Sequence, residues 1–299
     1  DRGEREGFLK VSVAFDRERA LPIVESVCVR GDNACSEQVR LAAQDAYDRL
    51  IFPSLEREIR AALTEQADEA AIKVFRTNLR QLLMQPPVKG KVAVGLDPGY
   101  RTGCKVAVVD ATGRVLDTGV IYPTHSQSKK DEAARTLRQL IIKHGAQVIA
   151  IGNGTASRET ELFTAEVLAS LRAEGKEAPS YMVVSEAGAS VYSASKLAAE
   201  EFPDYDVTLR SAVSIARRLQ DPLAELVKID PKAIGVGQYQ HDMPPKQLGE
   251  ALGGVVEDCV NSVGVDLNTA SPGLLEKVAG VTAAVSKNIG AYRGGHGAF

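Results

Sequence analysis

Two acidic residues follow apolar segments that end abruptly, and carboxylates in such positions can bind metal ions. Asp97 ends the apolar segment 91–97 and precedes a Pro-Gly turn, and Glu186 follows the apolar segment 180–184. In metal-dependent phosphoryl transfer, several carboxylates hold two Mg²⁺ ions about 3.5–4 Å apart and so neutralise charge on the reacting oxygens. If the two segments are neighbouring parallel strands, their acids share a cleft. A nuclease site would then need a third acid.

The expected place of that third acid holds a base. In ribonuclease H-like nucleases the third acid lies near the start of the helix after the last strand, and here Arg210 stands at about that place. Asp221 lies roughly 16 Å further along a helix axis, at 1.5 Å per residue, which is too far for the same metal pair. A guanidinium would instead pair with Asp97 or Glu186. We therefore predict no working catalytic residue and treat Asp97, Glu186 and Arg210 as vestiges of a nuclease site.

The first of these turns also supports a different class of protein. Asp97, Gly99 and Thr102 have the spacing of the phosphate-binding turn of sugar kinases, actin and heat-shock ATPases, so an ATPase is a third hypothesis after the nuclease. Those proteins need a second glycine-rich hairpin, and only one further glycine turn follows an apolar strand. That turn either offers amides to an anion at a helix N-terminus or only lets the chain reverse. The anion-binding candidates are Gly152, Asn153, Gly154 and Thr155.

The C-terminal segment has the layout of a helix-hairpin-helix unit. Such units present the amides of a Gly-x-Gly turn to a phosphate, and nearby Lys or Arg side chains add charge. Here Thr282 replaces the second glycine; its hydroxyl can cap a helix, but a β-branched residue tolerates positive φ poorly. The alternative is a packing module that contacts protein. The candidate nucleic-acid-binding residues are Lys277, Gly280, Val281, Thr282, Lys287 and Arg293.

The elements that must position these residues fall into three parts. Residues 1–87 are predicted to be helical after a strand-like opening at 8–16, and a proline pair ends the long helix. Residues 88–215 have the order β-β-β-α-β-α-β-α, which is that of the ribonuclease H-like fold, with an antiparallel meander first. Its later strands are so apolar that we expect them in the middle of a sheet covered on both sides. Residues 216–299 are predicted to form a helical linker and the helix-hairpin-helix. The predicted class is thus α/β plus all-α, with a mixed sheet between helical segments.

The composition of the chain limits how it can bind nucleic acid and other partners. The 299 residues include 36 Lys and Arg against 39 Asp and Glu, so nucleic acid must be bound by local patches or backbone amides. No apolar run reaches the roughly 18–20 residues of a membrane span, no signal peptide is recognisable, and the expected location is the cytoplasm. Four cysteines without a CxxC pair predict neither zinc nor disulfides. The Arg pair at 217–218 is expected on a solvated helix face.

Four long stretches resemble a known family, the bacterial transcription accessory proteins called Tex. They are residues 71–110, 185–203, 210–242 and 256–280. The resemblance covers essentially the whole chain and implies a YqgF-type, RuvC-resolvase-like ribonuclease H-fold domain beside helix-hairpin-helix units. It also implies a helical N-terminal region and a C-terminal S1-type RNA-binding domain. Neither is recognisable here, so we expect a fragment.

The resemblance further implies a role. The implied role is the binding of RNA, DNA or both without regard to base sequence, linked to transcription. The implied protein partner is RNA polymerase or other transcription machinery, and the nuclease domain is implied to be degenerate. No cofactor is expected. The alternative function is a metal-dependent nuclease or resolvase that uses Asp97 and Glu186 with Mg²⁺ and a third acid not recognised in the sequence.

Overall fold

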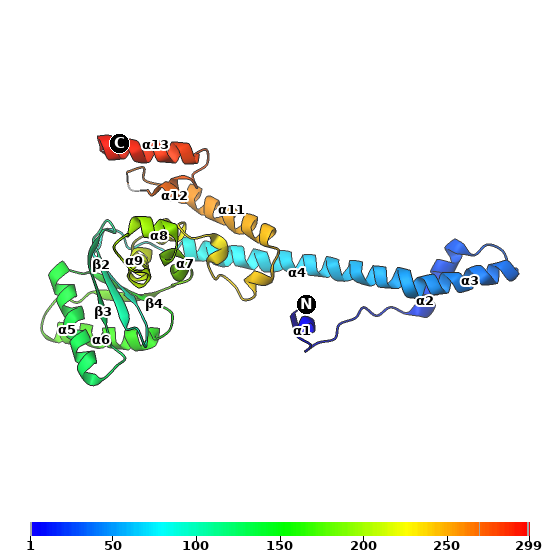
Figure 1. Cartoon of the computed structure of the whole chain (residues 1–299), viewed down its shortest axis with the longest axis horizontal. Helices are drawn as coiled ribbons and strands as arrows, with labels where there is room; N and C mark the ends of the chain where they lie inside the picture. The colour runs from blue at the N-terminus through cyan, green and yellow to red at the C-terminus, as the bar shows by residue number, and fades with distance from the viewer. Residues whose placement is uncertain (1, 269, 298) are drawn as a thin grey trace. The chain divides into compact units, whose positions relative to one another are not determined.

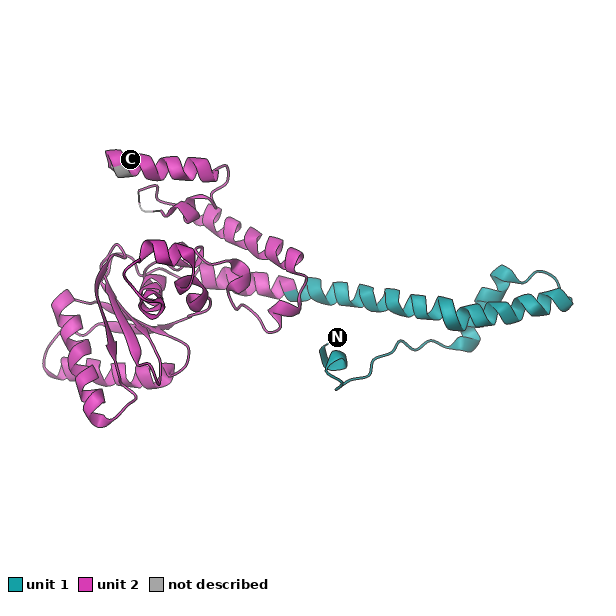
Figure 2. Ribbon diagram, in the orientation of Figure 1, with its two compact units in different colours: residues 1–71 teal, residues 72–299 magenta. Residues whose placement is uncertain are grey.

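The computed structural model describes residues 2–268, 270–297 and 299, which divide into two compact units, 1–71 and 72–299 (Figures 1 and 2). Helix α4 (Phe52–Leu83) contains the boundary between them. None of the described helices is both long and apolar enough to cross a membrane.

The first unit is helical. It comprises α1 (Arg2–Arg5), α2 (Arg17–Cys28), α3 (Ala34–Ala46), a π-helical turn (Tyr47–Ile51) and the beginning of α4. Asn33 starts α3, because its side chain accepts from the amides of Cys35 and Ser36 at 2.9 and 3.0 Å. The strand predicted at 8–16 is wrong: this segment is irregular, and no described residue of the unit forms a strand that could pair with it.

The second unit is built on a five-stranded sheet of order β3-β2-β1-β4-β5. The strands are β1 (Ala93–Asp97), β2 (Cys104–Val109), β3 (Val115–Ile121), β4 (Val148–Gly152) and β5 (Ser180–Val184). The first three form an antiparallel meander, whereas β1, β4 and β5 run parallel, so their C-terminal ends meet at one edge. The predicted ribonuclease H-like mixed sheet with flanking helices is confirmed.

Helices cover both faces of this sheet (Figure 1). On one face, α5 (Gln127–His144) and α6 (Ser157–Ala173) bury leucines and other apolar side chains against β1, β2 and β4. On the other face lies α9 (Val207–Gln220), which approaches β1 closely because residue 95 is glycine. A Cβ at Gly95 would lie 2.2 Å from the carbonyl oxygen of Ala212. Gly95 therefore brings α9 to the strand that ends in Asp97.

The apolar strands do not all lie in the middle of the sheet as predicted. β4 is buried along its whole length, which confirms the expectation for this strand. β5 is an edge strand, and Tyr181, Met182 and Val183 are exposed, so the expectation is wrong there. Apolar composition alone did not distinguish the two strands, because an edge position depends on the order of the whole sheet.

Short helices and the C-terminal region complete the unit. They are α7 (Ala189–Ser193), α8 (Lys196–Glu201), α10 (Pro222–Leu226), α11 (Pro245–Val263), α12 (Pro272–Leu275), α13 (Ala283–His296) and two 3₁₀ turns (Pro231–Ala233 and Gln240–Asp242). Buried Ser286 of α13 donates to the carbonyl of Pro272 at 2.9 Å and so fixes α13 against α12. The domain divisions at 87 and 215 stay predictions; the second falls inside α9.

Candidate nucleic-acid interface

Asp97 ends β1 beside a lysine and a serine. It lies opposite Lys105 of β2 in the antiparallel register, so the two side chains share a face of the sheet. The hydroxyl of Ser211, on α9, hydrogen-bonds to the Asp97 carboxylate. Burial raises the pKa of Asp97 above its usual range, and the hydrogen bond from Ser211 and the charge of Lys105 oppose this rise.

Glu186 lies just beyond the C-terminal end of β5, against the glycine turn that follows β4. The backbone amide of Gly154 hydrogen-bonds to its carboxylate, and the side-chain oxygen of Asn153 accepts from the Glu186 amide at 3.0 Å. A Cβ at Gly154 would lie 1.7 Å from Glu186 Oε1, so only glycine permits this approach. The pKa of Glu186 is raised by burial and then by the charge of Asp97, so the two predicted acids interact although β4 lies between their strands. We call Asp97 and Glu186 the carboxylate pair.

The turn 152–155 therefore already holds an anion. Its glycine-rich backbone was a candidate site for an external phosphate, but the amide of Gly154 and the space beside Gly152 and Gly154 are taken by Glu186. Phosphate would have to displace a carboxylate of the same chain. This removes the second anion site on which an ATPase would depend.

Arg210 does not contact the carboxylate pair. Its Nε donates to the carbonyl of Phe202 at 3.1 Å and its Nη1 to that of Ser193 at 3.4 Å, so the predicted pairing with Asp97 or Glu186 is not formed. Adjacent residues on a helix point about 100° apart, which follows from 3.6 residues per turn. The next residue, Ser211, therefore faces Asp97 in its place.

The cation that does lie beside Asp97 is Lys105. Only 7% of this lysine is exposed, and its Nζ donates to the carbonyls of Thr102 and Gly103 at 2.6 and 3.2 Å. Its charge also acts on Asp206, the N-cap of α9, which accepts from the Leu209 amide at 2.8 Å. Asp206 is the acid at the start of the last helix that the sequence analysis missed. A lysine inside the apolar strand 104–109 was the available signal for Lys105.

A second cation, Arg218, lies beside Glu186. Its Nη1 donates to the carbonyls of Ser185 and Ala187, both at 2.8 Å, on either side of Glu186. Arg218 is only 4% exposed, so its predicted place on a solvated helix face is wrong. Burial lowers the pKa of Arg218, and the charges of Glu225 and Glu186 oppose this effect. Arg218 thus neutralises part of the charge that a metal ion would otherwise balance.

These residues do not fit a Mg²⁺ site. Magnesium requires near-octahedral oxygen ligands, and a two-metal site requires several carboxylates. In the described part of the chain, no group of three or more His, Cys, Asp or Glu residues is placed to hold a metal ion. The carboxylate pair is instead bonded by Ser211 and Gly154 and lies beside Lys105 and Arg218.

The hairpin between α12 and α13 is the other candidate contact with phosphate. Asn261 of α11 fixes its entry: Nδ2 donates to the carbonyl of Lys277 at 3.0 Å, and Oδ1 accepts from the amide of Ala279 at 2.8 Å. Gly280 has φ +82°, and the hydroxyl of Thr282 accepts from the Val285 amide at 3.3 Å. Thr282 thus starts α13 as a cap, so only Gly280 adopts a positive φ in this turn.

The predicted basic residues of the hairpin have different roles. Lys287 is exposed on the first turns of α13, where the unpaired amides of a helix N-terminus attract anions. Lys277 is partly buried. Arg293 donates through Nη1 to the carbonyls of Leu267 and Ala270, both at 3.0 Å, so it holds the segment before α12. Of the three, Lys287 is the best placed to reach a phosphate.

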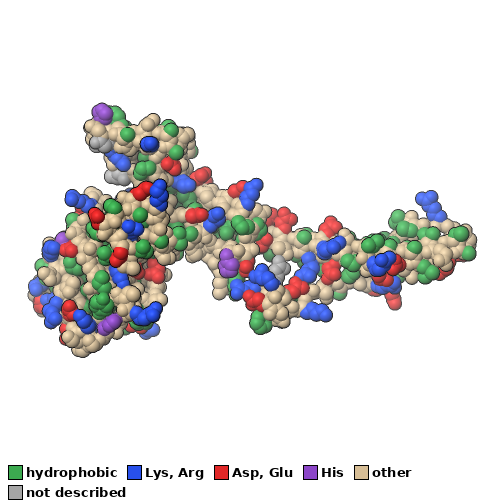
Figure 3. Space-filling view, in the orientation of Figure 1, with side chains coloured by type: hydrophobic (Ala, Val, Ile, Leu, Met, Phe, Trp, Pro, Cys, Tyr) green, Lys and Arg blue, Asp and Glu red, His purple; other side chains and the backbone are tan. Residues whose placement is uncertain are grey.

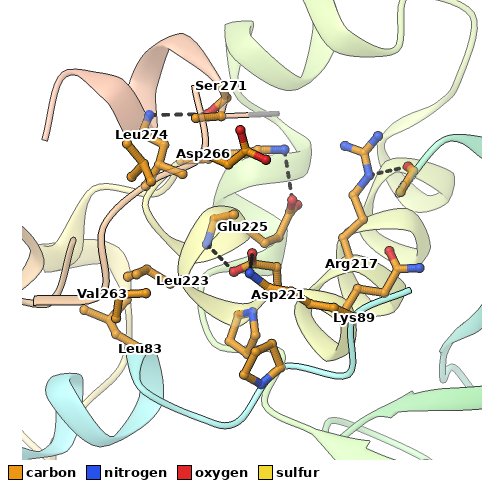
Figure 4. Close-up of a pocket in the computed structure, with 18 of the residues that line it drawn as sticks. Leu83, Lys89, Arg217, Asp221, Leu223, Glu225, Val263, Asp266, Ser271 and Leu274 are labelled. Atoms are coloured by element: carbon orange, nitrogen blue, oxygen red, sulfur yellow. Dashed lines mark hydrogen bonds and ion pairs between the residues drawn. The ribbon is translucent and has the colours of Figure 1, made fainter. Parts of the chain in front are cut away.

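A cavity of about 620 Å³ lies between α9, α10 and the segment leading to α12 (Figure 4). Its charged side chains pair with one another: Lys89 Nζ is 3.3 Å from Asp221, and Lys228 Nζ is 2.9 Å from Glu225. Leu83 and Leu274 add apolar walls. The cavity therefore has neither an excess of positive charge nor a contact with the carboxylate pair.

Charge is dispersed over the surface as well. On the face drawn in Figure 3, Lys and Arg side chains alternate with Asp and Glu and do not gather into one basic surface. This agrees with the net charge of −3. Any contact with nucleic acid is consequently local.

Comparison with known proteins identifies both regions. Residues 91–220 match the family described as Tex protein YqgF-like domain, and residues 260–299 match the helix-hairpin-helix motif. The protein named Protein tex of Bordetella pertussis is 48% identical over 312 residues, and the match covers 100% of this chain and 39% of that protein. The Transcriptional accessory protein Tex of Neisseria gonorrhoeae is 49% identical, again over 100% of this chain and 39% of its own length.

A human relative is also similar. The S1 RNA-binding domain-containing protein 1 of Homo sapiens is 47% identical over 85% of this chain and 25% of its own length. The chain thus spans 39% of the two bacterial relatives and less of the human one. With both regions matched and with nearly half of all positions identical to named relatives along its length, the chain belongs to the Tex family.

Proposed function

We propose that this chain binds nucleic acid through its helix-hairpin-helix, without regard to base sequence, and that its ribonuclease H-like domain does not hydrolyse the bound strand. We further propose that it acts as part of a transcription accessory factor in the cytoplasm, with transcription machinery as a protein partner. The name of the Neisseria relative supports this role. The name of the human relative supports the inclusion of RNA among the ligands.

The proposal rests on one difference between the two regions. The chain's own groups contact the acids of the carboxylate pair, but they leave Lys287 of the hairpin exposed. Asp97 and Glu186 are each bonded by a residue of this chain and lie beside a buried cation. By contrast, Lys287 is exposed at the start of α13. A phosphate can therefore approach the exposed Lys287 side chain without displacing an internal contact of that lysine, whereas a metal ion at the carboxylate pair would meet the positive charges of Lys105 and Arg218.

The test is a salt titration of binding. Fluorescence anisotropy is measured with labelled DNA and RNA of several base sequences, because each lost phosphate contact lowers the salt slope by about one. We expect Lys287→Ala to weaken binding equally for all sequences and to reduce the slope by about one.

Lys196→Ala is the matched control, since the side chain of Lys196 is 90% exposed and lies on α8 outside the hairpin. We expect its slope to equal that of the wild type. An unchanged slope in Lys287→Ala would remove the hairpin from the proposal.

A metal-dependent nuclease is the second candidate. It is favoured by one observation: the charge of Asp97 acts on Glu186, so two acids interact at this edge of the sheet. The two candidates differ in a single property. The nuclease must release products in a reaction that depends on Asp97, and the binding protein must not.

A further inference from the structure

Two exposed residues lie in the turn between β1 and β2, and the carboxylate pair gives them no role. Residues 98–103 follow Asp97 directly, and Tyr100 at their centre is 46% exposed. Arg101 beside it is exposed too, and within the described ranges it forms no hydrogen bond or ion pair. An exposed aromatic ring beside an unpaired guanidinium combines the side-chain types that stack on bases and contact the backbone of single-stranded nucleic acid.

Contacts with neighbouring side chains hold the backbone of this turn in place. Lys105 Nζ donates to the carbonyls of Thr102 and Gly103, and the His125 Nε2 lies 2.7 Å from the carbonyl of Tyr100. Gly103 has φ +76°, and a Cβ there would lie 2.7 Å from Tyr122, so this ring packs directly on the turn. Because these contacts already hold the backbone of the turn, little conformational entropy is lost when a ligand contacts its exposed residues.

The phenol end of Tyr100 is fixed as well. Its hydroxyl donates to Glu159 Oε1 on α6 at 2.9 Å, which anchors the edge of the ring. Tyr100 therefore presents an exposed side chain whose hydroxyl is held by Glu159.

The turn also adjoins the carboxylate pair. A Cβ at Gly152 would lie 3.3 Å from Pro98 Cδ and 2.7 Å from Glu186 Oε2, so the turn and Glu186 approach the same glycine. Carboxylates repel phosphates but do not prevent a neutral base from stacking. A strand passing here would thus meet Tyr100 and Arg101, which are adjacent in the chain and both exposed.

We propose that residues 98–103 form a stacking platform for single-stranded nucleic acid, with a base on the ring of Tyr100 and a backbone phosphate on the guanidinium of Arg101. This inference rests on the proposed function and names a second contact for the same ligand. Aromatic stacking with an adjacent cation is how many proteins bind single strands without reading their sequence. A paired base in a duplex has no free face, so the platform selects single strands.

The test compares single-stranded and double-stranded probes. A labelled twelve-nucleotide oligo-dT, an oligo-rU of the same length and a twelve-base-pair duplex are titrated against wild type and variants in fluorescence anisotropy. Loss of one base stack corresponds to about a tenfold or greater change in affinity. We expect Tyr100→Ala to weaken single-strand binding about tenfold and to leave duplex binding unchanged.

The companion variants separate stacking from other effects. Tyr100→Phe keeps the ring and should bind as the wild type does, whereas Arg101→Ala should weaken single-strand binding and lower its salt slope by about one. Tyr181→Ala is the matched control, since Tyr181 is 38% exposed and also contacts a glutamate of α6, Glu161, at 3.4 Å. We expect it to have no effect. Circular dichroism melting of each variant checks that the fold is intact.

The outcomes distinguish this inference from the proposed function. If Lys287→Ala weakens binding but Tyr100→Ala binds single strands as the wild type does, the platform is refuted and the hairpin remains. Equal losses for single strands and duplex in Tyr100→Ala, or an equal loss in Tyr181→Ala, also refute it. Failure of the wild type to bind any probe overturns both.

Discussion

The glycine turns before α6 and before α13 differ in what fills them. The turn before α6 holds the carboxylate of Glu186 on the amide of Gly154. The turn before α13 has a single left-handed glycine, Gly280, with nothing within 4 Å of the position of a Cβ. The first turn is thus filled by another part of the chain, whereas space is left beside the glycine of the second. A glycine turn before a helix can bind phosphate only when the rest of the fold leaves room for it.

The strongest test of this contrast changes the closed turn. In Gly154→Ala the new methyl group would meet Glu186 Oε1, so the carboxylate must leave the turn. We expect the free energy of unfolding to fall by about 1–3 kcal/mol, as for other overpacked sites. Urea denaturation measures the change.

Gly235→Ala is the control for this substitution. Gly235 lies in a loop, has nothing within 4 Å of the position of a Cβ, and needs no left-handed backbone. We expect a change of less than about 0.5 kcal/mol, or a small gain. If the two variants lose the same stability, Glu186 does not depend on the turn, and the contrast between the two turns fails.

The sequence predicted the fold well where its signals are local. The predicted alternation of strands and helices after the meander is present, and the three-strand meander follows from turns that can be recognised one at a time. The segment 8–16 has the composition of a strand but lacks a partner among the described residues of its unit, and pairing is not a local property. The edge position of β5 was missed for the same reason.

The candidate site was predicted only in part, and the errors have a geometric cause. Asp97 and Glu186 were expected at the ends of neighbouring parallel strands, but β4 lies between β1 and β5, so strand order alone does not join the two acids. A shift of one residue on α9 replaced Arg210 with Ser211. Lys105 was missed although a lysine inside the apolar strand 104–109 was a signal; the carbonyls of Thr102 and Gly103 that accept from it become known only from the fold of the turn.

A smaller effect concerns pH. Burial raises the pKa of Asp97 in the folded state, so the folded protein binds more protons than the unfolded one above the ordinary value of about 3.9. The wild type therefore loses stability as the pH rises through that region, and Asp97→Asn does not. We expect the variant to melt about 1–3 °C above the wild type at pH 7 and to lose this advantage near pH 3.

Asp117→Asn should show the opposite sign. Hydrogen bonds from Lys143 and His144 lower the pKa of Asp117 to about 2, so its ionised form stabilises the fold above the ordinary value. We expect this variant to be less stable than the wild type at pH 7 and similar to it below about pH 2. Melting temperatures above that of the wild type for both variants at pH 7 would contradict the difference between the two aspartates.

The most direct test of the proposal that the carboxylate pair does not cleave nucleic acid is a cleavage assay with purified protein. Labelled single-stranded RNA, single-stranded DNA and a branched duplex are incubated with wild type and with Asp97→Asn, each with Mg²⁺ or Mn²⁺. We predict that the wild type binds these substrates but releases no more product than Asp97→Asn does. Products that form with the wild type and disappear in Asp97→Asn would show that the pair is catalytic and would overturn the proposal.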